Sequence, residues 1–101
     1  MGQSVFVTAT VHVESFDHWK PLFDEGRDNR QGYGAVRHWM HRAVDDPSLL
    51  MITVEFPTRG EAEKFRDFLQ SDEFAERTKD HGVTAMPSVH LLQDFEEHDY
   101  A

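Results

Sequence analysis

The sequence predicts an α+β domain in which a four-stranded antiparallel sheet carries helices on one of its faces. Two observations lead to this fold class. The predicted elements follow the order strand, helix, strand, and the second half of the chain then repeats that order. The chain has 101 residues, of which 39% are hydrophobic, and this is enough for one core but too little for two. We therefore expect a single domain over residues 1–101.

The first strand is predicted for Ser4–Val13, because valine or alanine occupies every second position from Val5 onward. A period of two is typical of a strand with one buried face. The capping residue types Ser15 and Asp17 then precede apolar residues at helical spacing. This pattern predicts a first helix that ends near Arg30.

The next two strands are predicted to form a hairpin. Gly32 and Gly34 can adopt the positive φ angles that end a helix. The following segment, Ala35–Val44, is again rich in aromatic and β-branched residues, which favour a strand. The turn residues Asp45–Ser48 lead from it into a third strand, Leu49–Phe56.

The second helical region begins with a capping box at Thr58–Glu61, which predicts a helix from about Arg59 to Gln70. A further short helix is expected after Ser71, and the last strand is predicted for Ser88–Leu92. Residues 93–101 are rich in carboxylates, and we expect this tail to fray. The complete order of elements is that of the split βαβ, or ferredoxin-like, arrangement.

Alternation assigns the strand residues to two faces of the sheet, one covered by helices and one without them, which we call the bare face. With Val44 paired to Leu49, the hairpin has a short turn and His38 lies opposite Glu55 on the bare face. The residues expected on the bare face are Phe6, Thr8, Thr10, His12, His38, Met40, Arg42, Met51, Thr53 and Glu55, joined by either His90 and Leu92 or Val89 and Leu91. Those expected beneath the helices include Trp39 and His41, unless a bulge in the strand exchanges their faces.

This mixed bare face is too apolar to be left in water and too polar for an ordinary core. A second copy of the chain, packed sheet to sheet, would cover it and could enclose a cavity. We therefore expect a symmetric homodimer.

Composition excludes several classes of protein. Ten Lys and Arg against nineteen Asp and Glu give a net charge of −9, which disfavours nucleic acid as a partner. The absence of cysteine excludes disulfides, thiolate metal sites and a cysteine nucleophile. We see no apolar run long enough for a signal peptide or a membrane span, so we expect a cytoplasmic protein with no membrane partner.

Several segments together resemble a known group of proteins. They are Phe16–Asp24, Gly34, Arg42–Pro47 running into an apolar strand that ends at Glu55-Phe56, then Ala62, Phe65, and Gly82-Val83 before Pro87. The chain resembles the dimeric α+β barrel superfamily, and within it the small proteins called antibiotic-biosynthesis-monooxygenase-like or cyclase-like. The resemblance implies a dimer whose two sheets form a barrel, with a cavity in each protomer that lies either between the sheet and the helices or at the sheet face. Relatives in this superfamily include cofactor-independent monooxygenases of aromatic polyketide-like substrates, cyclases, lactone isomerases and haem binders. It has no universal catalytic motif, so no residue inherits a role from it.

Histidine is the best candidate for chemistry on the bare face, because imidazole exchanges protons near neutral pH. His38 would act as a general base and Glu55 would hold its ring in one tautomer. His12 and His90 would be secondary acids or bases. The alternative is that His38 and Glu55 form a cross-strand pair or an interface contact without a catalytic role. Three further histidines, His18, His81 and His98, are expected to face solvent.

The bare face offers candidate groups for binding a substrate, and Trp39, expected beneath the helices, is a further candidate. Arg42 could bind a carboxylate or phenolate, although it could equally pair with an acidic side chain across an interface. The remaining candidates could form apolar walls or hydrogen bonds, or could be plain packing and strand-forming residues: Phe6, Thr10, Trp39, Met40, Met51 and Thr53. Because no short ligand motif is present, we expect no metal and no other cofactor.

Three functions remain open. The first is a small cofactor-independent enzyme of secondary metabolism, a monooxygenase or cyclase that acts on an aromatic or polyketide-like molecule. The second is a non-catalytic or stress-associated dimer that holds a hydrophobic ligand in the same cavity. The third is a variant that binds a metal or haem.

Overall fold

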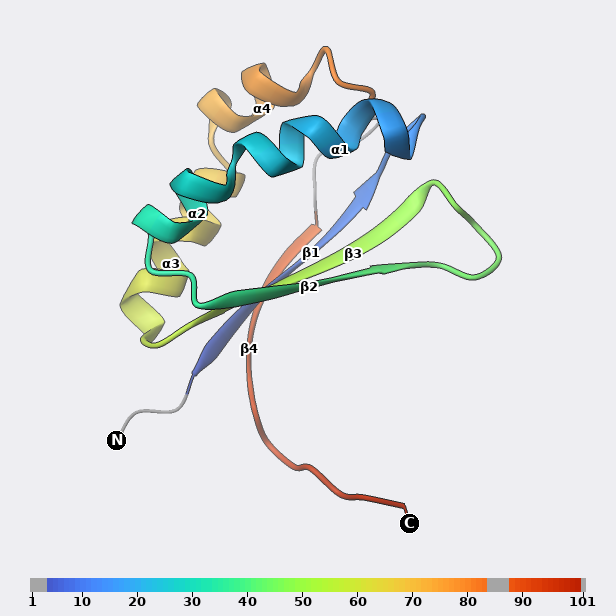
Figure 1. Cartoon of the computed structure of the whole chain (residues 1–101). Coiled ribbons are helices and arrows are strands. Elements are labelled where there is room, and N and C mark those ends of the chain that lie inside the picture. Colours follow the sequence, from blue (N-terminus) through green and yellow to red (C-terminus); the bar gives the residue numbers. More distant parts are fainter. Residues whose placement is uncertain (1–3, 84–87, 101) are drawn as a thin grey trace.

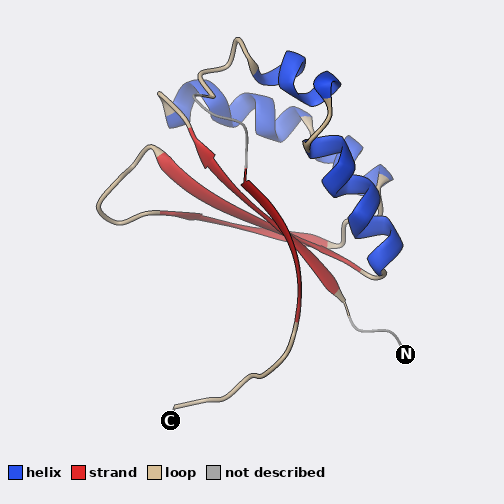
Figure 2. Ribbon diagram, turned by 180° about the vertical axis from the view of Figure 1, so that it is seen from behind, coloured by secondary structure: helices blue, strands red, loops and turns tan. Residues whose placement is uncertain are grey.

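The computed structural model describes residues 4–83 and 88–100. Its elements are β1 (Val5–His12), α1 (Phe16–Glu25), α2 (Arg27–Gly32), β2 (Arg37–Arg42), β3 (Leu49–Phe56), α3 (Arg59–Leu69), α4 (Asp72–Thr78) and β4 (Ser88–Gln93). The strands form one antiparallel sheet in the order β2-β3-β1-β4, and the helices lie together on one side of it (Figure 1; Figure 2). This is the ferredoxin-like α+β fold that the sequence predicts.

Local capping explains where the helices begin. The Ser15 hydroxyl accepts a hydrogen bond from the backbone N–H of His18 at the start of α1. At the start of α3, the Thr58 hydroxyl accepts from the N–H of Glu61 at 3.2 Å, so the predicted Thr58 cap is confirmed, and the Glu61 carboxylate accepts from the Thr58 hydroxyl at 2.8 Å. The first helical region is divided at Gly26, which separates α1 from α2.

One of the two glycines expected to take a positive φ does so. Gly34 has a φ of 105° in the connection from α2 to β2, whereas Gly32 is the last residue of α2 and its φ is not positive. A Cβ at Gly34 would overlap the end of the Glu61 side chain, which would have to move, and the positive φ itself favours glycine at this position.

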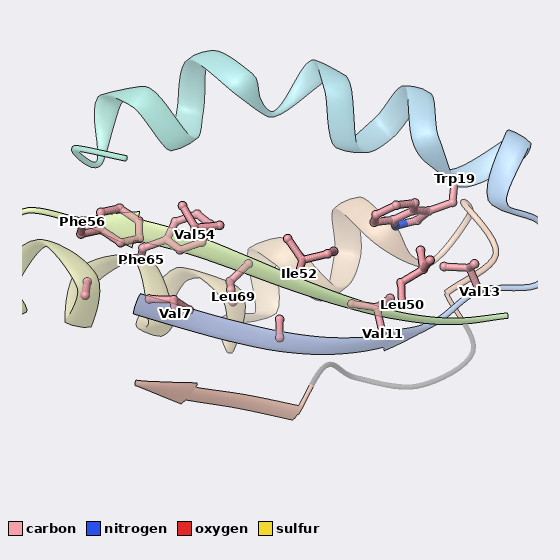
Figure 3. Close-up of a cluster of buried hydrophobic side chains, with 12 residues drawn as sticks. Val7, Val11, Val13, Trp19, Leu50, Ile52, Val54, Phe56, Phe65 and Leu69 are labelled. Carbon is pink, nitrogen blue, oxygen red and sulfur yellow. The ribbon is translucent and has the colours of Figure 1, made fainter. Parts of the chain in front are cut away.

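The core lies between the sheet and the helices. The valines of β1 alternate inward, and Val7 and Val13 are 1% exposed. From β3, Leu50 and Phe56 are fully buried, and Phe65 of α3 packs on Phe56 with ring centroids 5.3 Å apart (Figure 3). The covered face of the sheet therefore forms the hydrophobic core.

The hairpin between β2 and β3 differs from the prediction by one residue. His38 lies opposite Val54, and Arg37, not His38, lies opposite Glu55. The physical reason is the turn: Val44 is 97% exposed and belongs to the loop, so the loop is one residue longer than expected. Because side chains alternate along a strand, this shift exchanges the two faces of the whole of β2.

Candidate functional site

A cavity of about 410 Å³ lies between the helices and the covered face of the sheet. Its size falls within the range of small-molecule sites, roughly 300–1,000 Å³. The sheet contributes an aliphatic floor, and α1, α3 and α4 contribute most of the walls. The aliphatic and aromatic lining includes Val7, Ala9, Val11, Ile52 and Val54 below, and Trp19, Leu22, Phe23, Phe65, Phe68, Leu69 and Phe74 around the sides.

Helical spacing places aromatic rings around this cavity. Trp19 and Phe23 are one turn apart on α1, and their ring centroids are 5.4 Å apart. From the other side, Phe68 of α3 meets Phe74 of α4 edge-on at 5.4 Å. Trp19 points from α1 down to the sheet in Figure 3. Such walls suit a flat aromatic molecule, because rings pack favourably in offset or edge-to-face arrangements.

Arg30 is one of the few cationic groups in the lining. Its guanidinium carbon lies 3.8 Å from the centroid of the Phe23 ring, and its Nη1 donates to the Phe23 carbonyl at 2.8 Å. Burial lowers the pKa of Arg30, which the negative charge of Asp24 partly offsets. Within residues 4–83 and 88–100, Arg30 has no carboxylate within ion-pair distance.

His81 also lines the cavity, from the loop after α4. Its Nδ1 is buried and has no hydrogen-bond partner among the described residues. The ring centroid of His18 lies 6.1 Å away. His81 was expected to face solvent, because a histidine in a predicted loop beside Gly82 gives no signal of burial, but it lines the cavity with its Nδ1 buried.

The bare face contains the predicted residues of β1, β3 and β4. Register places Phe6 beside Glu55 and Leu92, and Thr8 beside Thr53 and His90. The assignment of the β1 and β3 residues to one face is confirmed, and of the two alternatives for β4 the structure has His90 and Leu92 on this face. Thr10, His12 and Met51 also lie on the bare face, as expected, because they continue the same alternation along β1 and β3.

The predicted residues of β2 are on the opposite face from the one expected. His38 packs edge-on against Phe23, with ring centroids 5.1 Å apart, on the covered side. The Arg42 guanidinium lies over the Phe16 ring of α1 at 5.6 Å, and Met40 packs against the core. The predictions that place His38, Met40 and Arg42 on the bare face are therefore wrong.

Trp39 and His41, in turn, lie on the bare face and not beneath the helices. The Trp39 ring is 6.0 Å from that of Phe6. A bulge in this strand was expected to be able to exchange the faces of Trp39 and His41. The faces are exchanged, but the cause is the longer turn between β2 and β3.

Glu55 has partners other than the expected histidine. It forms an ion pair with Arg37 at 2.8 Å and accepts a hydrogen bond from the Ser4 hydroxyl at 2.6 Å. The predicted pair of His38 and Glu55 is therefore not formed, because the two side chains project from opposite faces of the sheet.

The electrostatics of His38 favour the neutral ring. Partial burial lowers its pKa, the positive charges of Arg30 and Lys20 lower it further, and Asp24 acts in the opposite direction. At neutral pH the imidazole therefore has one donor and one acceptor nitrogen.

Residues 4–83 and 88–100 contain neither a cluster of metal ligands nor a helix that could span a membrane. No three His, Asp or Glu side chains in these ranges are arranged to hold a metal ion. No helix there combines the length and the apolar character needed to cross a bilayer.

The architecture defines a ferredoxin-like α+β protein with an apolar cavity between its helices and its sheet. No protein-family model matches the sequence, and no curated protein matches it either. Solved structures do match. A candidate antibiotic biosynthesis monooxygenase from Bordetella bronchiseptica is 20% identical, with a TM-score of 0.71 over 93% of this chain and 99% of that one.

Two further structures extend this likeness. A variant of SnoaB, a cofactor-independent oxygenase from Streptomyces nogalater, is 14% identical with a TM-score of 0.62, covering 98% of both chains. A dimeric ferredoxin-like protein from an uncultured marine organism is 10% identical with a TM-score of 0.57, covering 98% of this chain and 94% of that one. The predicted resemblance to antibiotic-biosynthesis-monooxygenase-like proteins is thus confirmed at the level of the fold.

Proposed function

We propose that this protein binds a flat aromatic or polyketide-like molecule in the cavity and acts on it as a small cofactor-independent oxygenase or cyclase of secondary metabolism. The observation that carries the proposal is the cavity of about 410 Å³, whose walls are mostly aromatic and aliphatic and whose polar groups are few. A cofactor-independent oxygenase, SnoaB, has the same fold, which supports this function over other uses of the cavity.

The reaction requires only the substrate and molecular oxygen. When a ring CH₂ group becomes a carbonyl, one oxygen atom of O₂ enters the product and the other leaves as water with both hydrogens. The substrate provides all the electrons. The protein must then bind the molecule, exclude water and accept a proton from the carbon or phenol that reacts.

His81 is the side chain best suited to accept this proton, in place of His38. It lines the cavity, and its buried Nδ1 has no hydrogen-bond partner in the described part of the chain. A small rotation of the ring would bring this nitrogen to a phenol hydroxyl in the cavity, which would satisfy it. The residues proposed from the sequence on the bare face, including His12 and His90, would have no direct part in this reaction.

We also propose that the bare face is the interface of a homodimer. It exposes large apolar side chains, with Trp39 at 39%, Met51 at 48% and Leu92 at 48%. A protein of the same fold is described as dimeric. The expectations of a cytoplasmic location, of no nucleic-acid partner and of no cofactor stay predictions.

A pair of neighbouring substitutions on β1 distinguishes the two faces as binding sites. Ala9 is part of the cavity floor, and Thr10 points to the bare face. We expect Ala9→Leu to fill the cavity and weaken binding of two-ring and three-ring phenols by about tenfold or more, measured by calorimetry, because added methylenes overpack a fixed space. Thr10→Leu should leave binding unchanged. If Thr10→Leu weakens binding and Ala9→Leu does not, the ligand binds at the bare face, and the proposal is overturned.

Turnover of the same phenols, followed by oxygen uptake and mass spectrometry, tests the reaction itself. Loss of a general base typically lowers turnover by about a hundredfold to ten-thousandfold, so His81→Ala should do so. His18→Ala, which removes the neighbouring ring, is the matched control. Unchanged turnover in His81→Ala would remove His81 from the reaction. Binding without any product would favour the non-catalytic ligand-binding function.

A further inference from the structure

A second hollow adjoins the cavity at the edge of the sheet. This groove of about 590 Å³ lies between the helical segment of α1 and α2 and the start of β2. Arg30 and Val54 line both the groove and the cavity. Arg30 therefore stands where the apolar cavity meets a polar opening.

The groove is locally basic in a protein of net charge −9. Arg27, Arg30 and Arg37 line it, against the single carboxylate of Asp24. Two of these charges are already paired, since Arg37 binds Glu55 at 2.8 Å and Asp24 binds Lys20 at 2.7 Å. Arg27 and Arg30 have no ion-pair partner within the described ranges.

Arg30 is held in a defined position, unlike the exposed Arg27. Its guanidinium lies on the Phe23 ring at 3.8 Å and donates one hydrogen bond, to the Phe23 carbonyl. The residue one turn earlier is Gly26, and a Cβ there would come within 2.9 Å of Arg30 Nη1. The chain thus leaves space for the guanidinium beside the cavity.

The Arg30 guanidinium is half-buried and has no ion-pair partner among the described residues, so a bound anion would offset part of the free energy that removing this cation from water costs. The group has five N–H donors, and the described residues accept from only one of its nitrogens. The remaining donors can form the two parallel bonds that a carboxylate requires.

We propose that Arg30 binds the carboxylate of an aromatic acid whose ring system occupies the cavity. The inference rests on the proposed binding function of the cavity and names the chemical class of its ligand. His38 lines the same groove and packs on the same Phe23 ring that lies under the Arg30 guanidinium.

The test compares an aromatic carboxylate with its neutral counterpart. Binding of 2-naphthoate and 2-naphthamide to the full chain is measured by calorimetry. We expect the wild type to bind the carboxylate about tenfold to a hundredfold more tightly, the usual gain from hydrogen bonds to a charged group. Arg30→Gln should reduce binding of 2-naphthoate to the level of the amide and leave the amide unchanged.

Arg27→Gln is the matched control, because it removes the same charge from the same groove and should have little effect. If Arg30→Gln fails to fold, Arg30→Lys is used in its place. This substitution keeps the charge but loses the planar fork of donors, so it should weaken binding of 2-naphthoate and leave binding of 2-naphthamide unchanged.

The outcomes separate this inference from the proposed function. Equal binding of the two compounds, or equal losses in Arg27→Gln and Arg30→Gln, would overturn the role of Arg30 and leave the cavity as the binding site. Failure of both compounds to bind, or binding that Ala9→Leu does not weaken, would overturn the cavity as well.

Discussion

The two faces of the sheet use the same strands for different purposes. On the covered face, β1 and β3 present aliphatic side chains that are nearly all buried, and the neighbouring helices leave a cavity above them. On the bare face, polar groups are paired within the sheet: Thr8 with Thr53 at 3.2 Å, and Glu55 with Arg37 at 2.8 Å.

The difference lies in which hydrogen-bonding groups have partners. On the bare face, the carboxylate of Glu55 already has two partners, so it has little capacity left for a ligand. Beside the cavity, the buried nitrogen of His81 has no partner in the described ranges and Arg30 donates only one bond. Polar groups that keep such capacity in a low-dielectric site are the ones that a ligand can engage most strongly. The covered side is therefore the better candidate for chemistry, and the bare face for assembly.

The largest difference between the faces is expected in stability. Phe56 is fully buried in the core, whereas Phe6 is partly buried on the bare face. Phe56→Ala should lower the free energy of unfolding by about 3–5 kcal/mol, because it leaves a cavity in a close-packed core. Phe6→Ala should cost clearly less. Urea unfolding at low protein concentration measures both, and equal losses would contradict the view that only the covered face is a core.

Dimerisation should depend on side chains of the bare face. Met51 lies on the bare face, 48% exposed, and Val44 is 97% exposed in the β2–β3 loop. We expect Met51→Glu to raise the dimer dissociation constant by about tenfold or more, because it brings two like charges into an apolar interface. Sedimentation velocity at micromolar concentration measures this.

Val44→Glu is the control for the added charge and should leave association unchanged. A wild-type protein that sediments as a monomer would show that the bare face is not an interface between copies of this chain.

The fold was predictable because its signals are local. Alternation from Val5 onward marks β1, and the capping box at Thr58 marks the observed start of α3 at Arg59. The register of the hairpin was not predictable in this way. Val44 is β-branched and resembles a strand residue, yet it belongs to the turn, and the length of a turn is set by its three-dimensional path.

The site was harder to predict than the fold, because a cavity is a property of packing between helices that are distant in the sequence. Nothing near His81 in the chain shows that its side chain lines the cavity. Arg30 did give a signal: it lies seven residues after Phe23, hence on the same side of the helical segment as the apolar residues. A cation on an apolar stripe is a candidate for ligand binding, although plain snorkelling gives the same pattern.

The smallest effect expected is on the protonation of His38, where the groove meets the sheet edge. Partial burial and the charges of Arg30 and Lys20 lower its pKa, and Asp24 opposes them. NMR titration should therefore give a pKa below that of the same histidine in the urea-unfolded chain. Arg30→Gln should raise the pKa of His38 toward its ordinary value, because one of the nearby positive charges is removed.

The lowered pKa of His38 also makes the stability of the fold depend on pH. Between the lowered pKa and the ordinary value, the unfolded chain binds more protons at His38 than the folded chain does. The fold should therefore lose stability as the pH falls through that window, and His38→Asn should reduce this loss. If 2-naphthoate binds at Arg30, its negative charge should raise the pKa of His38, whereas 2-naphthamide should not. If the pKa of His38 changes neither in Arg30→Gln nor when 2-naphthoate is bound, the groove binds no anion near this edge of the sheet.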